Sequence, residues 1–124
     1  MSFLVLRAYL ELMRVDLCLV YGDFASLYKR VRACPVNKEA GSPASAEEVC
    51  AAVDLACIWY WKQVLCLQRS AAAACLLKRR GINAVMVLGA QQMPFKAHAW
   101  VEVDGRVAND RPYVREMYAV LDQC

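Results

Sequence analysis

The sequence predicts an α+β fold, in which N-terminal helices precede a helix packed on a small antiparallel sheet. Apolar residues recur at helical spacing before and after a loop at residues 34–44, as far as residue 59. A further helical pattern over residues 64–80 ends at Gly81, a residue type that commonly follows helices. Beyond Gly81 the chain carries short apolar or alternating runs separated by turn residues, which is typical of strands.

The first two helices are predicted from the spacing of their apolar residues. One stripe at helical spacing comprises Phe3, Leu6, Leu10, Met13, Leu17 and Val20. Arg7, Glu11 and Arg14 lie on another face of this amphipathic helix, where they can form ion pairs. Gly22 ends the helix, and Asp23 can cap a second one. The second helix would turn four residues inward, namely Phe24, Leu27, Tyr28 and Val31.

Two more helices are expected after a loop over residues 34–44. Ser45 and Glu48 form a capping box that opens a helix through about Trp59. A bend over residues 60–62 separates it from the next helix, which begins near Val64 or Leu65 and has an alanine run in its middle. Because alanines have little bulk, this fourth helix can approach a sheet closely.

Three strands and a short helix complete the expected fold. The strands are expected at Ala84–Leu88, buried on both faces, at Ala97–Val103 and at Arg106–Asn109, and the helix at Tyr113–Leu121. Pro94 lies in the first connecting loop, and Asp104-Gly105 forms the second turn.

Composition and charge exclude several classes of protein. Hydrophobic residues make up 60% of the chain, so it is not a disordered segment, and it has apolar surface to offer a partner. The net charge of +3 includes no basic stripe interleaved with aromatics, which argues against nucleic-acid binding. The basic run at 78–80 lies where a helix ends and complements its dipole. Charges within the apolar N-terminus argue against a membrane span or a signal peptide.

The seven cysteines indicate a reducing, cytoplasmic compartment without disulfides. Most of them lie within apolar helical patterns, as small buried side chains do. No two have CxxC spacing, and there is one histidine, so we expect neither a metal nor another cofactor.

Three residues have the chemistry of a cysteine acyl-transfer triad. Cys66 lies in the first turn of its predicted helix, where the positive end of the helix dipole favours a thiolate. His98 can act as its base and alternates with Trp100 and Glu102 on the less aliphatic face of a strand. Asp110 can orient the imidazole. A lone cysteine or histidine is more often structural, and Asp110 could equally begin a turn, so the prediction depends on the three together.

The register of the last hairpin determines whether the imidazole meets the carboxylate. A two-residue turn at Asp104-Gly105 would place His98 opposite the residue after Asp110. A three-residue loop would instead pair Glu102 with Arg106 and His98 with Asp110. We favour the three-residue loop because both of these pairs are favourable.

Two groups are candidate donors to an oxyanion. One is the backbone N–H of Cys66 at a helix N-terminus, and the other is the side-chain amide of Gln63, three residues earlier. An exposed glutamine in a bend also needs no such role.

Three segments resemble the transglutaminase-like cysteine peptidases of lasso peptide biosynthesis, the leader peptidases also known as the B-protein family. They are CLQRSAAAACLLKRRG, AVMVLGAQQMPFKAHAWVEVDG and VANDRPY, which cover residues 66–113 closely, with a looser likeness over 114–121. The resemblance implies a transglutaminase/papain-like core, a catalytic helix on a small antiparallel sheet. The family's catalytic cysteine, histidine and aspartate fall on Cys66, His98 and Asp110.

The resemblance also implies a function and partners. Such an enzyme removes the leader of a precursor peptide through a thioester, after which a separate cyclase closes the macrolactam. Some members carry a winged-helix-like leader-recognition element at the N-terminus. Because residues 1–61 contain no winged β-hairpin pattern, we expect a stand-alone peptidase that acts with a separate leader-recognition protein. We expect one domain over 1–124, with a helical part over 1–61 and a catalytic core over 62–124.

Two alternatives remain open. The same triad can pass the acyl group to an amine, as a transglutaminase does. The chain could also be a non-catalytic helical protein that binds a partner through its apolar surface, in which case Cys66 would be no more reactive than the other cysteines.

Overall fold

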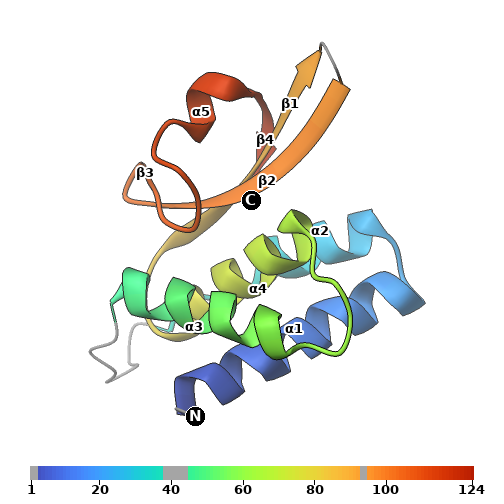
Figure 1. Ribbon diagram of the computed structural model, residues 1–124, viewed down its shortest axis with the longest axis vertical. Coiled ribbons are helices and arrows are strands. Elements are labelled where there is room, and N and C mark those ends of the chain that lie inside the picture. The colour runs from blue at the N-terminus through green and yellow to red at the C-terminus, as the bar shows by residue number, and fades with distance from the viewer. Residues whose placement is uncertain (1–2, 38–44, 93–94) are drawn as a thin grey trace.

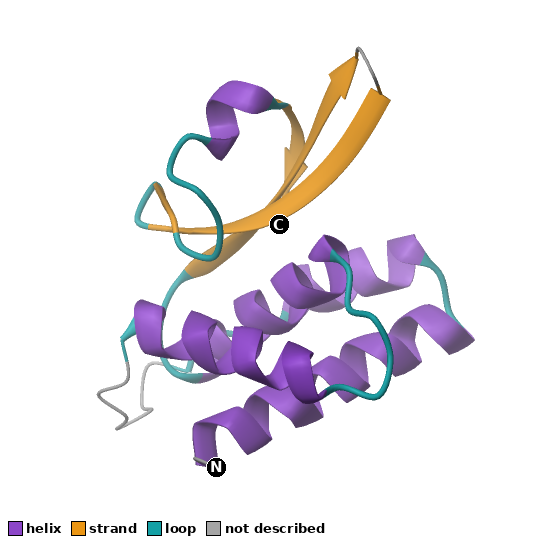
Figure 2. Cartoon of the chain, in the orientation of Figure 1, coloured by secondary structure: helices purple, strands orange, loops and turns teal. Residues whose placement is uncertain are grey.

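The computed structural model describes residues 3–37, 45–92 and 95–124, which form a layer of helices with an antiparallel sheet on one side (Figures 1 and 2). The helices of the first layer are α1 (Phe3–Tyr21), α2 (Phe24–Ala33), α3 (Ala46–Trp59) and α4 (Cys66–Arg79). The later elements are β1 (Ala84–Gln92), β2 (Phe95–Val103), β3 (Arg106–Val107), α5 (Val114–Met117) and β4 (Ala119–Gln123). The α+β class predicted from the sequence is confirmed.

The helix α1 has two apolar faces, and only one of them packs against the rest of the chain. The buried face consists of Val5, Ala8, Leu12 and Val15 and contacts α3 and α4. The stripe found in the sequence faces solvent, since all six of its residues are exposed: Phe3, Leu6, Leu10, Met13, Leu17 and Val20. Spacing alone could not show which of the two faces the neighbouring helices would cover.

Charged residues at the helix interface are paired. The predicted ion pair between Glu11 and Arg14 forms at 3.3 Å, but Glu11 is buried and also contacts Arg79 of α4 at 3.2 Å. Lys78 is buried as well, and its Nζ donates a hydrogen bond to the carbonyl of Val31 at 2.8 Å. These contacts join α4 to α1 and α2.

The predicted helix ends agree closely with the structure. The side chains of Asp23 and Ser45 each accept an N–H from the residue three positions later, at 2.9 and 3.2 Å. Gly81 follows α4 with a φ of +85°, which glycine adopts without strain. Phe24 is exposed rather than turned inward as predicted, because it lies at the very start of α2.

The sheet has the strand order β3-β2-β1-β4, with every pairing antiparallel. The β1–β2 hairpin is longer than predicted, and β3 is shorter. The predicted C-terminal helix is confined to α5, and the sequence prediction missed β4, which pairs with β1. Pro94 and most of the predicted loop, residues 38–44, lie outside the described residues.

The main core lies between the helices and the inner face of the sheet. The alanine run at 71–74 is fully buried there, as its lack of bulk predicted. A smaller cluster on the outer face comprises Val87, Trp100 and Val114. Gly89 permits the close packing of this cluster, since a Cβ there would lie 2.8 Å from the Trp100 ring.

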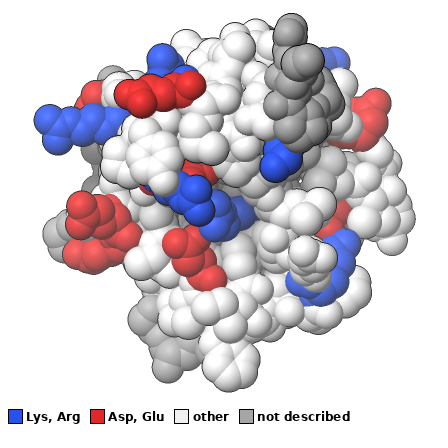
Figure 3. All heavy atoms as spheres, turned by 45° about the horizontal axis from the view of Figure 1, so that its top comes forward, with Lys and Arg blue, Asp and Glu red and all other residues white. Residues whose placement is uncertain are grey.

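The described part of the chain includes no helix long and apolar enough to cross a membrane. On the face drawn in Figure 3, Lys and Arg side chains alternate with Asp and Glu side chains, and wide uncharged areas lie between them. All seven cysteines are free thiols.

Candidate active site

Cys66 is the first residue of α4 and is half-buried. The preceding residue, Leu65, offers no polar side chain to the helix, but its own N–H donates to Oε1 of Gln68 at 2.9 Å. Cys66 thus lies in the first turn of α4, at the positive end of the helix dipole.

The most buried cysteines are in a different situation. Burial raises the pKa of Cys75 to about 12 and that of Cys50 to about 11, because a thiolate in the core loses its hydration. These two thiols stay protonated at neutral pH. The burial that the sequence predicted for most of the cysteines is found for these two, whereas the other five are half-buried.

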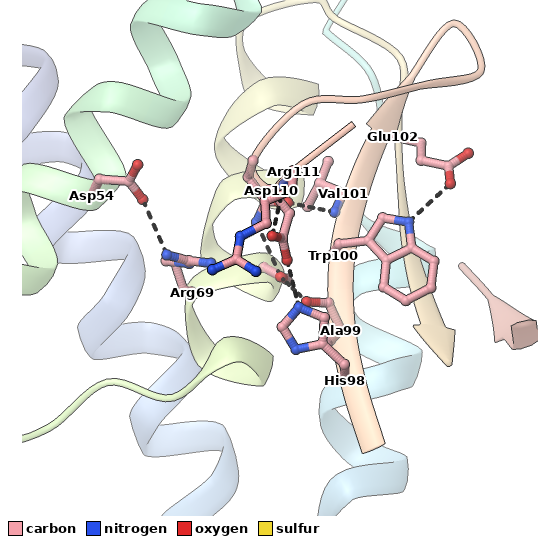
Figure 4. A network of polar contacts seen from close by, with 11 residues as sticks. Asp54, Arg69, His98, Ala99, Trp100, Val101, Glu102, Asp110 and Arg111 are labelled. Atoms are coloured by element: carbon pink, nitrogen blue, oxygen red, sulfur yellow. Dashed lines mark hydrogen bonds and ion pairs between the residues drawn. The ribbon is translucent and has the colours of Figure 1, made fainter. Parts of the chain in front are cut away.

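His98 and Asp110 are in direct contact. Nε2 of the imidazole is hydrogen-bonded to Oδ2 of the carboxylate (Figure 4). The two side chains are only 22% and 15% exposed. Burial alone would raise the pKa of Asp110, but the hydrogen bonds from His98 and from the backbone N–H of Arg111 (2.7 Å) outweigh it and lower that pKa. The carboxylate therefore stays ionised beside the imidazole.

The imidazole is also held by aromatic rings on the outer face of the sheet. Its ring stacks on that of Tyr118, with centroids 5.2 Å apart and an interplanar angle of 27°. Trp100, on the same face of β2, lies 6.1 Å away. Because Nε2 of His98 bonds the carboxylate, Nδ1 is the nitrogen left to exchange a proton with another group.

The predicted register of the last hairpin is wrong, although the predicted contact forms. Val103 pairs with Arg106 across a two-residue turn, in which Asp104 has a φ of +53° and Gly105 a φ of +76°. Both left-handed residues are what a tight hairpin of this type requires. Asp110 reaches His98 because the chain leaves the sheet after β3 and bends back.

The expected ion pair between Glu102 and Arg106 is consequently absent among the described contacts. Glu102 instead accepts a hydrogen bond from Nε1 of Trp100 at 2.9 Å and pairs with Arg115 near the start of α5. This carboxylate thus ties α5 to the strand that carries His98.

Two residues that the sequence reasoning did not single out hold the bend in place. The side-chain oxygen of Asn109 accepts the N–H of Val101 at 2.7 Å, and its amide donates to Oγ of Ser70 at 3.1 Å. Ser70 in turn donates to the carbonyl of Ala99 at 3.0 Å. All of these groups are buried, so helix α4, strand β2 and the loop before Asp110 form one hydrogen-bonded unit. The sequence signal for both residues was their place in segments that resemble the lasso leader peptidases, CLQRSAAAACLLKRRG and VANDRPY.

Cys66 and His98 line the same cavity, which has a volume of about 350 Å³. A second hollow, a groove of about 640 Å³, begins on the other side of Cys66 and is lined by Gln63 and Arg69. Cys66 and His98, the predicted nucleophile and base, thus line one cavity, and Gln63 lines the groove that Cys66 also borders. No group of three or more possible metal ligands occurs in residues 3–37, 45–92 and 95–124.

Arg69, one turn along α4 from Cys66, is a further charged residue near the site. It forms an ion pair with Asp54 of α3 at 3.7 Å, and its positive charge contributes to the lowered pKa of Asp110 (Figure 4). Its Nε is buried without a hydrogen-bond partner.

Comparison with known proteins identifies the family. Residues 10–123 match the transglutaminase-like superfamily. The chain belongs to that superfamily. The transglutaminase-like core expected from the sequence is thereby confirmed. A stretch of 56 residues is 43% identical to the Microcin J25-processing protein McjB of Escherichia coli. The aligned stretch covers 45% of this chain but only 27% of that relative. No solved structure gives a significant match to this transglutaminase-like chain.

Proposed function

We propose that this transglutaminase-like protein is a cysteine peptidase that cleaves the leader from a lasso peptide precursor. The observation that carries the proposal is the shared cavity of Cys66 and His98, together with the hydrogen bond from His98 to Asp110. The partial likeness to a microcin-processing protein supports the choice of a precursor peptide as substrate.

In this proposal His98 takes the proton of Cys66, and the sulfur attacks the carbonyl carbon of the last leader residue. As the C–N bond breaks, His98 gives that proton to the amine of the first core residue. The leader remains on Cys66 as a thioester. Water then attacks the thioester, with His98 as base, and the free leader acid leaves as the thiol is restored. Asp110 keeps the imidazole oriented and stabilises its positive charge.

The oxyanion of the tetrahedral intermediate needs hydrogen-bond donors. The backbone N–H of Cys66 lies at the helix N-terminus, where it is not needed for the helix itself. We assign the second donor to the side chain of Gln63, which lines the groove that begins at Cys66.

We also propose that residues 1–61 and 62–124 act as one domain and that the helical part binds a separate leader-recognition protein. The support is the exposed stripe of α1, whose six apolar side chains lie outside the hydrophobic core. The released core peptide would pass to a macrolactam cyclase, a further partner. Seven free thiols suit a cytoplasmic location, where reductants keep cysteines unpaired.

A second candidate reaction follows from the superfamily match, since a transglutaminase passes the acyl group to an amine. The fate of the thioester separates the two reactions. The experiment is incubation of the protein with a lasso precursor and a leader-binding protein, followed by mass spectrometry of the products. Peptidase activity gives a free leader acid, which contains one added water, and acyl transfer gives an amide of the leader.

The same samples test the non-catalytic alternative. If the chain only binds a partner, no product forms and the thiol of Cys66 reacts with an alkylating reagent no faster than Cys18 or Cys57, which are also half-buried. That outcome would overturn the peptidase proposal.

A further inference from the structure

The cavity shared by Cys66 and His98 has an apolar character that the chemistry of a thioester does not require. Its walls come from α2, α4, β1, β2 and β4, and they include the side chains of Phe24, Leu67, Leu88 and Leu121. The groove on the other side of Cys66 also has apolar walls, from Ile58, Val64 and Leu65, but the ion pair of Asp54 and Arg69 lines it as well. Such an ion pair is absent from the residues that line the cavity of Cys66 and His98.

Leu121 is aimed at this cavity by an irregularity of the sheet. In the pairing of β4 with β1, Asp122 lies opposite Leu88 and Val120 lies opposite Gly89. Since Leu88 and Gly89 are adjacent, Leu121 is an extra residue without a partner, which makes it a β-bulge. Bulges redirect a side chain and occur often beside active sites.

The hydrophobic core does not require Leu121 or Phe24 to be apolar. Leu121 is 68% exposed and Phe24 is 46% exposed, so neither gains much from the core. Phe24 lies at the beginning of α2 and Leu121 in β4. The two residues are far apart in the sequence, yet both line the same cavity. A large apolar side chain from another molecule would bury both.

We propose that this cavity binds an apolar side chain of the peptide substrate directly beside the scissile bond, and that Leu121 and Phe24 determine this preference. The inference rests on the proposed peptidase function and adds the chemical class that the site selects. A volume of about 350 Å³ accommodates one large aliphatic or aromatic side chain with its adjoining backbone. Continuity with Cys66 and His98 is what places that side chain next to the reacting bond.

The first test needs no precursor. The wild-type chain is treated with two thiol reagents of matched reactivity, benzyl methanethiosulfonate and the charged sulfonatoethyl methanethiosulfonate, and the labelling rate of Cys66 is followed by peptide mass spectrometry. We expect the benzyl reagent to label Cys66 about tenfold faster, because its ring enters the cavity. Leu121→Asn and Phe24→Ser should each remove most of this preference.

Val120→Asn is the matched control. Val120 is the neighbour of Leu121 in β4 and is also exposed, but it does not line the cavity. Its variant should keep the benzyl preference of the wild type. Equal labelling by both reagents in the wild type, or an equal effect of Val120→Asn and Leu121→Asn, would overturn the inference.

The second test uses cleavage of precursors that differ only in the residues flanking the scissile bond. Replacing the favoured apolar residue by serine should lower kcat/KM about tenfold or more for the wild type, and much less for Leu121→Asn. Leader release with no such discrimination overturns the inference while the proposed function stands. Selective labelling of Cys66 without any leader release supports the apolar site and overturns the peptidase proposal.

Discussion

The imidazole of His98 is fixed from two directions, by a carboxylate at its edge and by an aromatic ring on its face. Asp110 bonds Nε2, and Tyr118 stacks at 5.2 Å. An imidazole fixed in this way presents its free nitrogen in one orientation, which would lower the entropy cost of the proton transfer that we propose. Asparagine in place of Asp110 would keep the shape of this contact but not its negative charge.

Asp110→Asn should therefore slow leader cleavage by about 10²- to 10⁴-fold without unfolding the chain. The amide cannot stabilise the imidazolium and can hold the wrong tautomer. Cleavage rates at neutral pH, together with circular dichroism, check this expectation. A variant that is folded and as fast as the wild type would remove Asp110 from the site.

The stability difference between the wild type and Asp110→Asn should depend on pH. The pKa of Asp110 is lowered in the folded chain from the ordinary 3.8, so the unfolded chain binds the proton more readily. The stabilisation from this carboxylate is complete above that ordinary pKa and is lost as the pH falls through the lowered one. The advantage of the wild type over Asp110→Asn in urea unfolding should thus shrink between pH 7 and about pH 3. A constant difference would show that the carboxylate is not stabilised by its contacts.

The bend after β3 brings Asp110 to His98, a contact that the sequence analysis expected from the register of the hairpin. Asn109 replaces the missing strand partner, because its side-chain oxygen accepts the N–H of Val101. Asn109→Ala leaves buried groups unpaired, so it should cost about 1–3 kcal/mol of stability. It should also slow cleavage, since Asp110 is the next residue. Asn83→Ala, at an exposed asparagine before β1, is the control that should change neither quantity.

The hairpin turn itself can be tested separately. Gly105 has a φ of +76°, and a Cβ added there would meet no other atom. Gly105→Ala should therefore lower the stability only through its left-handed backbone, by about 1–2 kcal/mol. Asp104→Asn should be neutral or slightly stabilising, because asparagine is favoured at that position. Urea unfolding of both variants measures this. An unchanged stability of Gly105→Ala would contradict the two-residue turn.

The turn also shows where sequence reasoning reached its limit. Favourable cross-strand pairs are worth about 0.2–1 kcal/mol each, and they argued for the longer loop. The Asp104-Gly105 pair suits the tight turn better, and the chain after β3 was free to bend toward His98 by hydrogen bonds that spacing does not reveal. The helix caps at Asp23 and Ser45 were predictable because they depend on a few adjacent residues. The pairing of β4 with β1 depends on residues about 30 positions apart, and its apolar pattern also fits a helix.

At the scale of the whole molecule, the exposed stripe of α1 marks the surface that we assign to a leader-binding partner. A flexible leader bound to such a partner reaches an effective concentration of about millimolar at the peptidase. Cleavage should therefore be slow with the chain alone and rise with partner concentration at a fixed precursor concentration. Full activity without any partner would show that this chain recognises the leader by itself.

Substitutions on the stripe locate the contact. Leu10→Glu with Met13→Glu should abolish stimulation by the partner, while stability changes by less than about 0.5 kcal/mol because both side chains are exposed. Met117→Glu on α5, at another exposed apolar residue, should leave stimulation intact. Stimulation that survives the double substitution would place the partner elsewhere.

The proposed mechanism requires that Cys66 carry the leader as a thioester, and this intermediate can be trapped. The protein, a lasso precursor and a leader-binding protein are mixed, quenched in acid after short times and analysed by peptide mass spectrometry. We expect the peptide that contains Cys66 to gain the mass of the leader less one water. Cys66→Ala should form neither adduct nor free leader, whereas Cys75→Ala, at a buried thiol with a pKa of about 12, should form both. Leader release at the wild-type rate by Cys66→Ala, or an adduct on a different cysteine, would contradict this mechanism.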